Sequence, residues 1–188
     1  MKVPVGISNR HVHLNKQDLE ILFGKDYVLK SLKEVNQPGE YASVDTVSIM
    51  TKKSRINNVR VLGPIRNYTQ VEISRTDAYK LGINPPIKTS GDLSGSEEII
   101  IIGPKSLIRK KEACIQANRH IHITEEKLNE LGLLKDDVVS LKIDGEKSGI
   151  INNVIFRISK NAYFEVHLDT DDANAFLLKN NDEVEIIK

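Results

Sequence analysis

The chain has few of the residues that characterise secreted, membrane-spanning or nucleic-acid-binding proteins. Its 188 residues include one cysteine, no tryptophan and only two methionines. A single cysteine excludes a disulfide within the chain, which is typical of proteins from a reducing compartment. The longest aliphatic run, residues 99–102, is far shorter than the roughly 20 residues needed to cross a bilayer.

An excess of charge of one sign is also missing. Lysine and arginine total 27 against 26 aspartates and glutamates, so the net charge is +1. Nucleic-acid-binding proteins usually carry a strong positive excess, and we therefore expect no nucleic-acid partner. The first residues do not form a signal peptide. Together these absences predict a cytoplasmic protein with no membrane partner.

The histidines, in contrast, are concentrated in a motif that occurs twice. Four of the five lie in the pattern Asn-Arg-His-x-His, at residues 9–13 and 118–122. Each copy follows an apolar, strand-like segment and precedes a helix-like one, so we place both at strand ends. Residues two apart on a strand point to the same face, and the two imidazoles of each copy can therefore bind one metal ion. An isolated pair would more often be an ordinary surface or core feature, and the repetition favours metal.

A second repeat identifies further ligand candidates. The segment Ile-Asn-Asn-Val occurs at 56–59 and 151–154, an offset of 95 residues. If the same offset applies further along the chain, Glu72 of the first half is equivalent to His167 of the second, the fifth histidine. Both residues lie in segments whose apolar and polar residues alternate as in a strand. The two HxH copies lie 109 residues apart, so the first half is 14 residues longer between its motifs, which we place around residues 37–40.

The two repeats together give six candidate ligands: His11, His13, Glu72, His120, His122 and His167. Six side chains are too many for one zinc ion and suit two. Three protein ligands leave the open position that is typical of catalytic zinc, whereas a structural site uses four. We therefore expect two open zinc sites, with iron, cobalt and manganese as alternatives because histidine-rich sites discriminate weakly among these metals.

Three other residues each allow two interpretations. Arg10 and Arg119, inside the repeated motif, either brace the ligand strands or contact a substrate. Cys114 is either a nucleophile or a buried apolar residue, and the surrounding segment 113–115 favours burial.

The remaining pattern consists of many short β-branched segments and few helices. The helices are predicted to begin at the capping residues Asn15 and Thr124, directly after each HxH motif. The chain is too short for the (β/α)₈ barrel of roughly 250 residues that carries HxH motifs in many metal-dependent hydrolases. Halves of this size and composition close most readily as small barrels. We predict a mainly β protein with short α-helices, in which an internal duplication forms two similar β-barrel domains.

We place the first barrel at residues 1–85, a connecting segment at 86–112 and the second barrel at 113–188. These boundaries are approximate, and the halves can exchange strands. The metals are expected where the halves meet.

The chain resembles the PduL-type phosphate propanoyltransferases. The resemblance is carried by segments 3–14, 62–72, 90–93 and 117–122, and it extends over essentially the whole chain. It implies a two-barrel fold, two zinc ions per chain and a homodimer. It also implies reversible transfer of a short acyl group, propanoyl or acetyl, between coenzyme A and inorganic phosphate.

The resemblance also assigns roles to individual residues. The metal ligands of the family fall on the same six residues that the repeats select, and its phosphate-binding arginine falls on Arg66. The repeat position of Arg66 is Asn161, so this cation is not duplicated. The loop containing Ser90, Gly91 and Asp92 is a candidate coenzyme A contact, with a flexible linker as the alternative.

The implied chemistry requires no nucleophile from the protein. Zinc would stabilise the oxyanion and the thiolate, and Arg66 would hold phosphate in line for attack. Family members packaged in bacterial microcompartments carry an amphipathic N-terminal extension, and here the shared motif already begins at Val3, so we expect a free cytoplasmic form. A zinc-dependent thioester or amide hydrolase and a non-catalytic zinc-binding module remain alternative functions.

Overall fold

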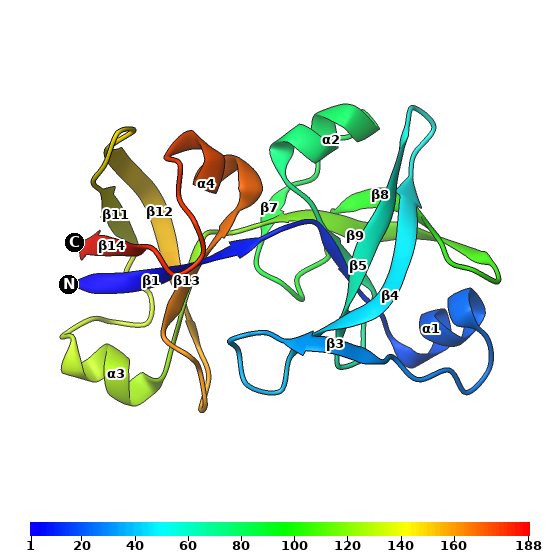
Figure 1. Cartoon of the computed structure of the whole chain (residues 1–188), viewed down its shortest axis with the longest axis horizontal. Coiled ribbons are helices and arrows are strands. Elements are labelled where there is room, and N and C mark those ends of the chain that lie inside the picture. The colour runs from blue at the N-terminus through cyan, green and yellow to red at the C-terminus, as the bar shows by residue number, and fades with distance from the viewer. The chain divides into compact units, whose positions relative to one another are not determined.

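A computed structural model describes residues 1–188 as two compact units. One consists of Arg10–Ala117 and is called the first barrel; the other joins Met1–Asn9 to Asn118–Lys188 and is called the second barrel. Each is built around a closed ring of strands, which Figure 1 shows with short helices at its edges. None of the helices is long and apolar enough to cross a membrane.

The first barrel closes through six strands in the order β4-β5-β2-β6-β9-β8, with β8 returning to β4. Two short strands lie outside the ring, β3 beside β4 and β7 beside β9. The elements of this barrel are β2 (His11–His13), α1 (Lys16–Phe23), β3 (Ser31–Glu34), β4 (Tyr41–Met50), β5 (Arg55–Gly63), β6 (Gln70–Glu72), α2 (Arg75–Leu81), β7 (Ile87–Lys88), β8 (Glu97–Ile102) and β9 (Leu107–Ala117).

The second barrel is a closed ring in the order β1-β13-β10-β12-β11-β14, completed by pairing of β14 with β1. Its strand β1 is the start of the chain, and the rest of the ring comes from the last third. The elements are β1 (Lys2–Ser8), β10 (His120–Ile123), α3 (Glu125–Glu130), β11 (Val139–Ile143), β12 (Gly149–Ile158), β13 (Glu165–Asp169), α4 (Thr170–Ala175) and β14 (Glu183–Ile187).

The two rings have the same topology. In each, the HxH strand runs parallel to the strand with the Asn-Asn pair and antiparallel to the strand of the third candidate ligand. Strand β9 in the first ring is equivalent to β1 in the second, since each pairs in parallel with the strand of the third candidate ligand. Along the chain, however, β9 leads into β10 of the second barrel, and β1 leads into β2 of the first. The prediction of a mainly β protein with two β-barrels is confirmed; duplication is the interpretation that this match supports.

The repeated Asn-Asn pair has a local conformational reason. Asn58 and Asn153 have positive φ angles of 57° and 62°, a left-handed conformation that asparagine tolerates better than most residues. At both places the pairing with the neighbouring strand shifts by one residue, as in a β-bulge. The bulge allows Ile56 and Val59, three positions apart, both to be buried.

Side chains at the strand ends begin the helices that follow the ligand strands. Asn15 and Thr124 cap α1 and α3 as predicted, each accepting a hydrogen bond from a backbone N–H of the first turn. Ser74 and Asp169 cap α2 and α4 in the same way, directly after β6 and β13. Each barrel packs its own apolar core.

Candidate active site

One group of predicted ligands lies within the first barrel. His11 is directly opposite Glu72 in the β2–β6 pairing, so both side chains leave the sheet on the same face. The Nε2 atoms of His11 and His13 lie 3.5 and 4.0 Å from the carboxylate oxygens of Glu72. Both imidazoles are buried, and one donor atom from each of the three residues lies within 4.8 Å of the others.

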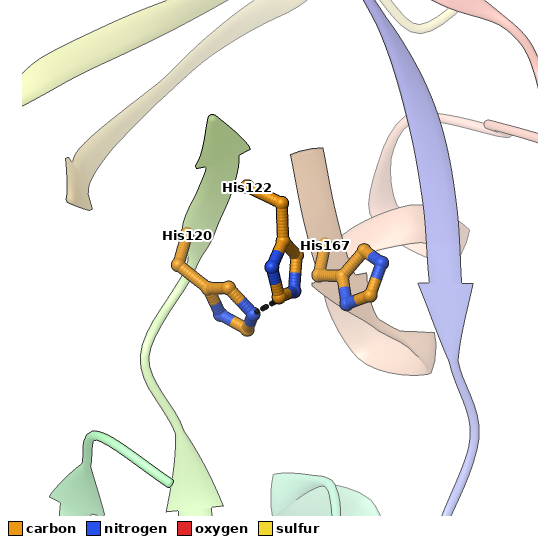
Figure 2. A group of neighbouring side chains, drawn as sticks. All are labelled: His120, His122 and His167. Carbon is orange, nitrogen blue, oxygen red and sulfur yellow. Dashed lines mark hydrogen bonds between the residues drawn. The ribbon is translucent and has the colours of Figure 1, made fainter. Parts of the chain in front are cut away.

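The other three predicted ligands form a corresponding group within the second barrel. Figure 2 shows His120 and His122 on β10 facing His167 on β13, and His120 is directly opposite His167 in the strand pairing. The Nε2 atoms of His120 and His122 are 3.1 Å apart. His120 directs Nδ1 to the carbonyl oxygen of Asn118 at 2.7 Å. A carbonyl oxygen only accepts, so Nδ1 carries a proton, and in the neutral imidazole Nε2 then presents its lone pair to the group.

The chemistry of both groups suits a divalent transition metal. Each offers three imidazole or carboxylate donors from two adjacent strands, converging within 4.8 Å. This matches the three-ligand pattern of catalytic zinc, which leaves a coordination position open. A backbone carbonyl that accepts the second ring proton of a histidine, as Asn118 does, is the usual support for a metal-ligating imidazole.

Two residues beside these groups were missed by the sequence analysis. Gln70 is opposite His13 in the strand pairing, and Glu165 is opposite His122. The amide of Gln70 donates a 2.6 Å hydrogen bond to Glu72, while the carboxylate of Glu165 lies 2.8 Å from Nε2 of His167. The offset of 95 that pairs Glu72 with His167 also pairs Gln70 with Glu165, so the same signal was present in the sequence.

The side chain of Glu165 occupies space that is open because residue 6 is a glycine. The side chain is 4% exposed, and a Cβ atom at Gly6 would lie 2.6 Å from its carboxyl carbon. Gly6 is opposite His167 in the parallel pairing of β1 with β13. Strand β1 therefore passes close to Glu165 only because it carries glycine at this position.

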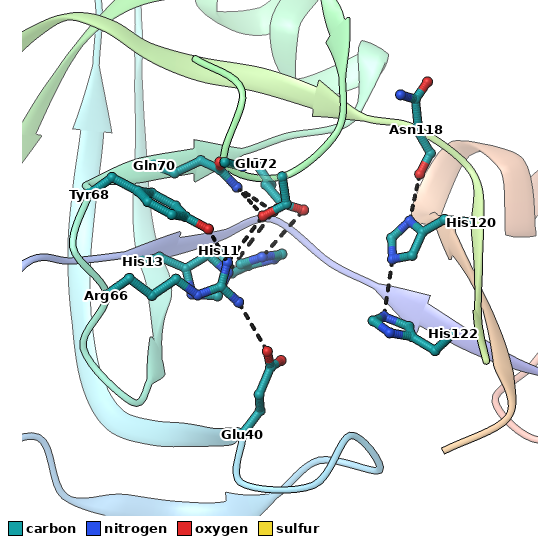
Figure 3. Close-up of polar contacts among 12 residues, drawn as sticks. His11, His13, Glu40, Arg66, Tyr68, Gln70, Glu72, Asn118, His120 and His122 are labelled. Carbon is teal, nitrogen blue, oxygen red and sulfur yellow. Dashed lines mark hydrogen bonds and ion pairs between the residues drawn. The ribbon is translucent and has the colours of Figure 1, made fainter. Parts of the chain in front are cut away.

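Arg66 lies in the first barrel, and its guanidinium group is held from two sides. Nη1 donates to the hydroxyls of Tyr68 at 2.8 Å and Ser90 at 3.1 Å, while Nη2 donates to Glu40 at 3.1 Å. Figure 3 shows the guanidinium between Tyr68 and Glu40. The backbone N–H of Arg66 donates to the carbonyl of Leu14, just beyond the HxH strand, which brings this residue near the ligand strand.

A chain of hydrogen bonds connects Arg66 to the ligand group of the same barrel. Ser90 accepts one hydrogen bond from Arg66 and one of 2.8 Å from Gln70, and Gln70 in turn donates to Glu72. The N–H of Gly91 donates to the amide oxygen of Gln70 at 2.8 Å, which fixes the orientation of that amide. The arrangement places a cation and a candidate metal group in one polar network.

Asp92, the third residue of the predicted coenzyme A loop, has different surroundings. Its carboxylate is bonded to the ammonium of Lys88 at 2.8 Å and to the hydroxyl of Ser94. The hydrogen bond from Lys88, with that from Ser94, lowers the pKa of Asp92 to about 2. The structure thus brings Ser90 and Gly91 to Arg66 and Gln70, whereas Asp92 is held in an exposed ion pair.

The arginines of the repeated motif contact aspartates near the helix N-termini. Nε of Arg10 is 2.8 Å from Asp77, and Arg119 makes two bonds of 2.7 Å to Asp172. The hydrogen bond to Asp172 raises the pKa of Arg119. Each pair ties an HxH strand to the helix that follows the third candidate ligand, which supports a bracing role over substrate contact.

Cys114 is completely buried, and burial raises the pKa of its thiol, which disfavours a nucleophilic thiolate.

Comparisons with known proteins agree over nearly the whole chain. Residues 4–179 match the family described as phosphate propanoyltransferase. The chain is 47% identical over 185 residues to the phosphate propanoyltransferase of Thermotoga maritima, covering 98% of this chain and 88% of that protein. The corresponding protein of Rhodopseudomonas palustris is 41% identical over 187 residues, with 100% and 83% covered. That of Salmonella typhimurium is 43% identical over 174 residues, with 92% and 82% covered.

Proposed function

Since the chain belongs to the phosphate propanoyltransferase family, and is therefore an acyltransferase, we propose that it transfers a propanoyl or acetyl group reversibly between coenzyme A and inorganic phosphate with the assistance of zinc. The observation that carries the proposal is the hydrogen-bonded connection from Arg66 through Ser90 and Gln70 to Glu72. It joins an anion-binding cation to a candidate metal group within one barrel.

In this proposal each barrel holds one zinc ion. His11, His13 and Glu72 are the ligands in the first barrel, and the corresponding set in the second is His120, His122 and His167. Bound zinc would supply Lewis-acid stabilisation of negative charge on the thioester oxygen and on the departing sulfur. The strands that carry the ligands are paired directly, so the donor atoms are held in place before a metal arrives.

Arg66 would bind and orient phosphate. A guanidinium presents five N–H donors in a planar fork that matches phosphate oxygens. Tyr68 and Ser90 together hold Nη1, which limits rotation of the guanidinium. A phosphate held here would have its oxygen positioned for attack, and positioning of this kind lowers the barrier of a two-substrate reaction.

The proposed step conserves atoms and charge without a protein nucleophile. An oxygen of hydrogen phosphate forms a bond to the thioester carbon, the carbon–sulfur bond breaks, and the phosphate proton ends on the coenzyme A thiol. Cys114 is buried, and the hydroxyl of Ser90 accepts hydrogen bonds from Arg66 and Gln70. Neither of these two partners can act as a base toward Ser90, which supports direct transfer through a tetrahedral intermediate.

The proposal also includes a coenzyme A contact, an oligomeric state and a location in the cell. Ser90, Gly91 and Asp92 are proposed to contact coenzyme A. The backbone N–H groups of Gly91 and Asp92 already donate within the protein, to Gln70 and Thr89, so this contact would involve other groups of the loop. We also propose that the protein acts as a homodimer in the cytoplasm.

The deciding experiment is thiol release from propanoyl-CoA by the zinc-loaded protein, with and without phosphate. We expect release that requires phosphate and produces acyl phosphate, detected as a hydroxamate after addition of hydroxylamine. Release that proceeds equally without phosphate would replace the proposal with a hydrolase. No release from folded protein with a measured zinc content would favour a non-catalytic zinc-binding module.

A further inference from the structure

The carboxylate of Glu40 occupies one side of the Arg66 guanidinium. Oε1 of Glu40 lies 3.1 Å from Nη2, and the side chains of Glu40 and Arg66 are 33% and 16% exposed. Figure 3 shows this pair on the side of the guanidinium away from Tyr68. The position next to a proposed phosphate-binding arginine is therefore taken by an anion of the protein itself.

The element that carries Glu40 has no counterpart in the other barrel. Glu40 ends the loop between β3 and β4, and in the second barrel the equivalent strand β11 pairs only with β12 and β14. The connection from α1 to β4 covers residues 24–40, whereas that from α3 to β11 covers only 131–138. Arg66 likewise has Asn161 at its repeat position. Glu40 thus lies in a segment that the second barrel lacks, and Arg66 lies at a shared position where the second barrel has a neutral asparagine.

The fold places Glu40 beside Arg66 through the start of β4. Tyr41 is opposite Gly63 in the β4–β5 pairing, and its ring lies against Gly63 so closely that a side chain there would clash. Two backbone hydrogen bonds hold the loop at Glu40, one from its N–H to Gln37 and one to its carbonyl from Val35. The backbone is therefore fixed, while the partly exposed carboxylate can rotate away from the guanidinium without unfolding the loop.

A carboxylate and a phosphate compete for the same kind of donor. Both bind guanidinium N–H groups as anions, and two anions on one cation repel each other. Phosphate binding at Arg66 must therefore weaken or break the bond between Nη2 and Glu40. The bonds from Nη1 to Tyr68 and Ser90 involve neutral hydroxyls and carry no such conflict.

We propose that Glu40 is the resident anion of Arg66 in the substrate-free enzyme and that phosphate displaces it, so that Glu40 sets the affinity for phosphate. The inference rests on the proposed function, because it takes Arg66 to be the phosphate-binding residue. Glu40 keeps the cation neutralised and oriented between turnovers. It acts through Arg66 and is a positioning and specificity residue, not a catalytic one.

The test compares Glu40→Gln with the parent enzyme in the direction that uses acyl-CoA and phosphate. Removing the competing charge should lower KM for phosphate about two- to fivefold, the range expected for a partly exposed ion pair. KM for acyl-CoA should stay unchanged. Glu34→Gln is the matched control, because it removes the same charge from the exposed end of β3 in the same hairpin. An unchanged or increased KM for phosphate in Glu40→Gln would overturn the proposal.

A binding measurement separates this proposal from the proposed function. Phosphate that binds the folded protein at concentration c stabilises it by RT ln(1 + c/Kd) and so raises its melting temperature, with no need for turnover. At each phosphate concentration the melting temperature of Glu40→Gln should rise by more than that of the parent, and the rise for Glu40→Asp should lie between them. If the parent protein shows no phosphate-dependent thiol release, the proposed function fails, and the melting curves still decide whether Glu40 competes with phosphate. If it is active and the curves coincide, only the inference on Glu40 fails.

Discussion

Glu72 lies directly opposite His11 across the β2–β6 pairing, at the register position that His167 holds opposite His120 across β10–β13. A carboxylate and an imidazole thus occupy equivalent places in two rings of the same topology. The two candidate metal groups share their geometry and differ in charge, because only the first has a carboxylate among its three donors. Arg66, the residue proposed to bind phosphate, is found in the barrel with that carboxylate.

This equivalence makes Glu72 the most informative ligand to replace. Glu72→Ala should lower the zinc content from two ions per chain to one, because it leaves the first group with two donors. Glu72→His should keep the zinc content at two, since it reproduces the ligand set of the second barrel. Metal analysis of the purified variants checks both expectations. Equal zinc contents in Glu72→Ala and the parent would remove Glu72 from the ligand set.

Replacement of Arg66 should affect phosphate use and leave the metals in place. Arg66→Ala should lower kcat/KM for phosphate about ten- to a hundredfold, because charge-assisted hydrogen bonds to the anion are lost. Steady-state kinetics at varied phosphate, with zinc content measured in parallel, provides the check. Arg109→Ala is the matched control, because Arg109 pairs with Glu98 on the exposed surface of the same barrel. A phosphate dependence equal to that of the parent would show that Arg66 does not bind phosphate.

The salt bridge between Arg119 and Asp172 should contribute to the stability of the fold. Arg119→Ala should lower the free energy of unfolding by about 1 kcal/mol, because it removes two hydrogen bonds to Asp172 and one to the carbonyl of Asn152, and leaves a carboxylate without its cation. Arg119→Lys should lose less, since lysine restores the charge without the bidentate geometry. Urea unfolding of zinc-loaded protein measures both. Equal losses in the two variants would indicate that charge at position 119 is irrelevant.

Asp92 provides a prediction of pH dependence. Its pKa is lowered from 3.8 to about 2 in the folded protein, chiefly by the hydrogen bond from Lys88. A carboxyl group with a depressed pKa stabilises the fold above its unfolded pKa, and that contribution is lost as the pH falls from about 3.8 to about 2. NMR titration of the Asp92 carboxyl carbon should give a midpoint near the lower value. Lys88→Met should move the midpoint up toward the ordinary value, and an unmoved midpoint would contradict the assigned cause.

Much of the site could be predicted because its parts are local or repeated. The HxH spacing needs only the period of a β-strand, and the helix starts at Asn15 and Thr124 need only a capping side chain. The third candidate ligands, Glu72 and His167, followed from a constant offset, because equivalent strands in the two halves have the same register. Gln70 was open to prediction in the same way, because it lies two residues from Glu72 on β6 and shares the offset of 95 with Glu165. Glu40 was missed as a partner of Arg66, since a contact between two separate loops leaves no periodic pattern in the sequence.

By itself the sequence determined the strand-rich composition, the six candidate ligands and the fact that the repeat position of Arg66 is an asparagine, Asn161. These depend on side-chain chemistry and on spacing along a single strand, which the order of residues specifies directly. Only the tertiary structure decided that β1 and β9 each complete one ring and then lead into the HxH strand of the other barrel. It alone also placed Glu40 at Arg66. Pairing between distant segments is chosen by burial and backbone hydrogen bonding over the whole fold, and a local pattern of residues does not encode that choice.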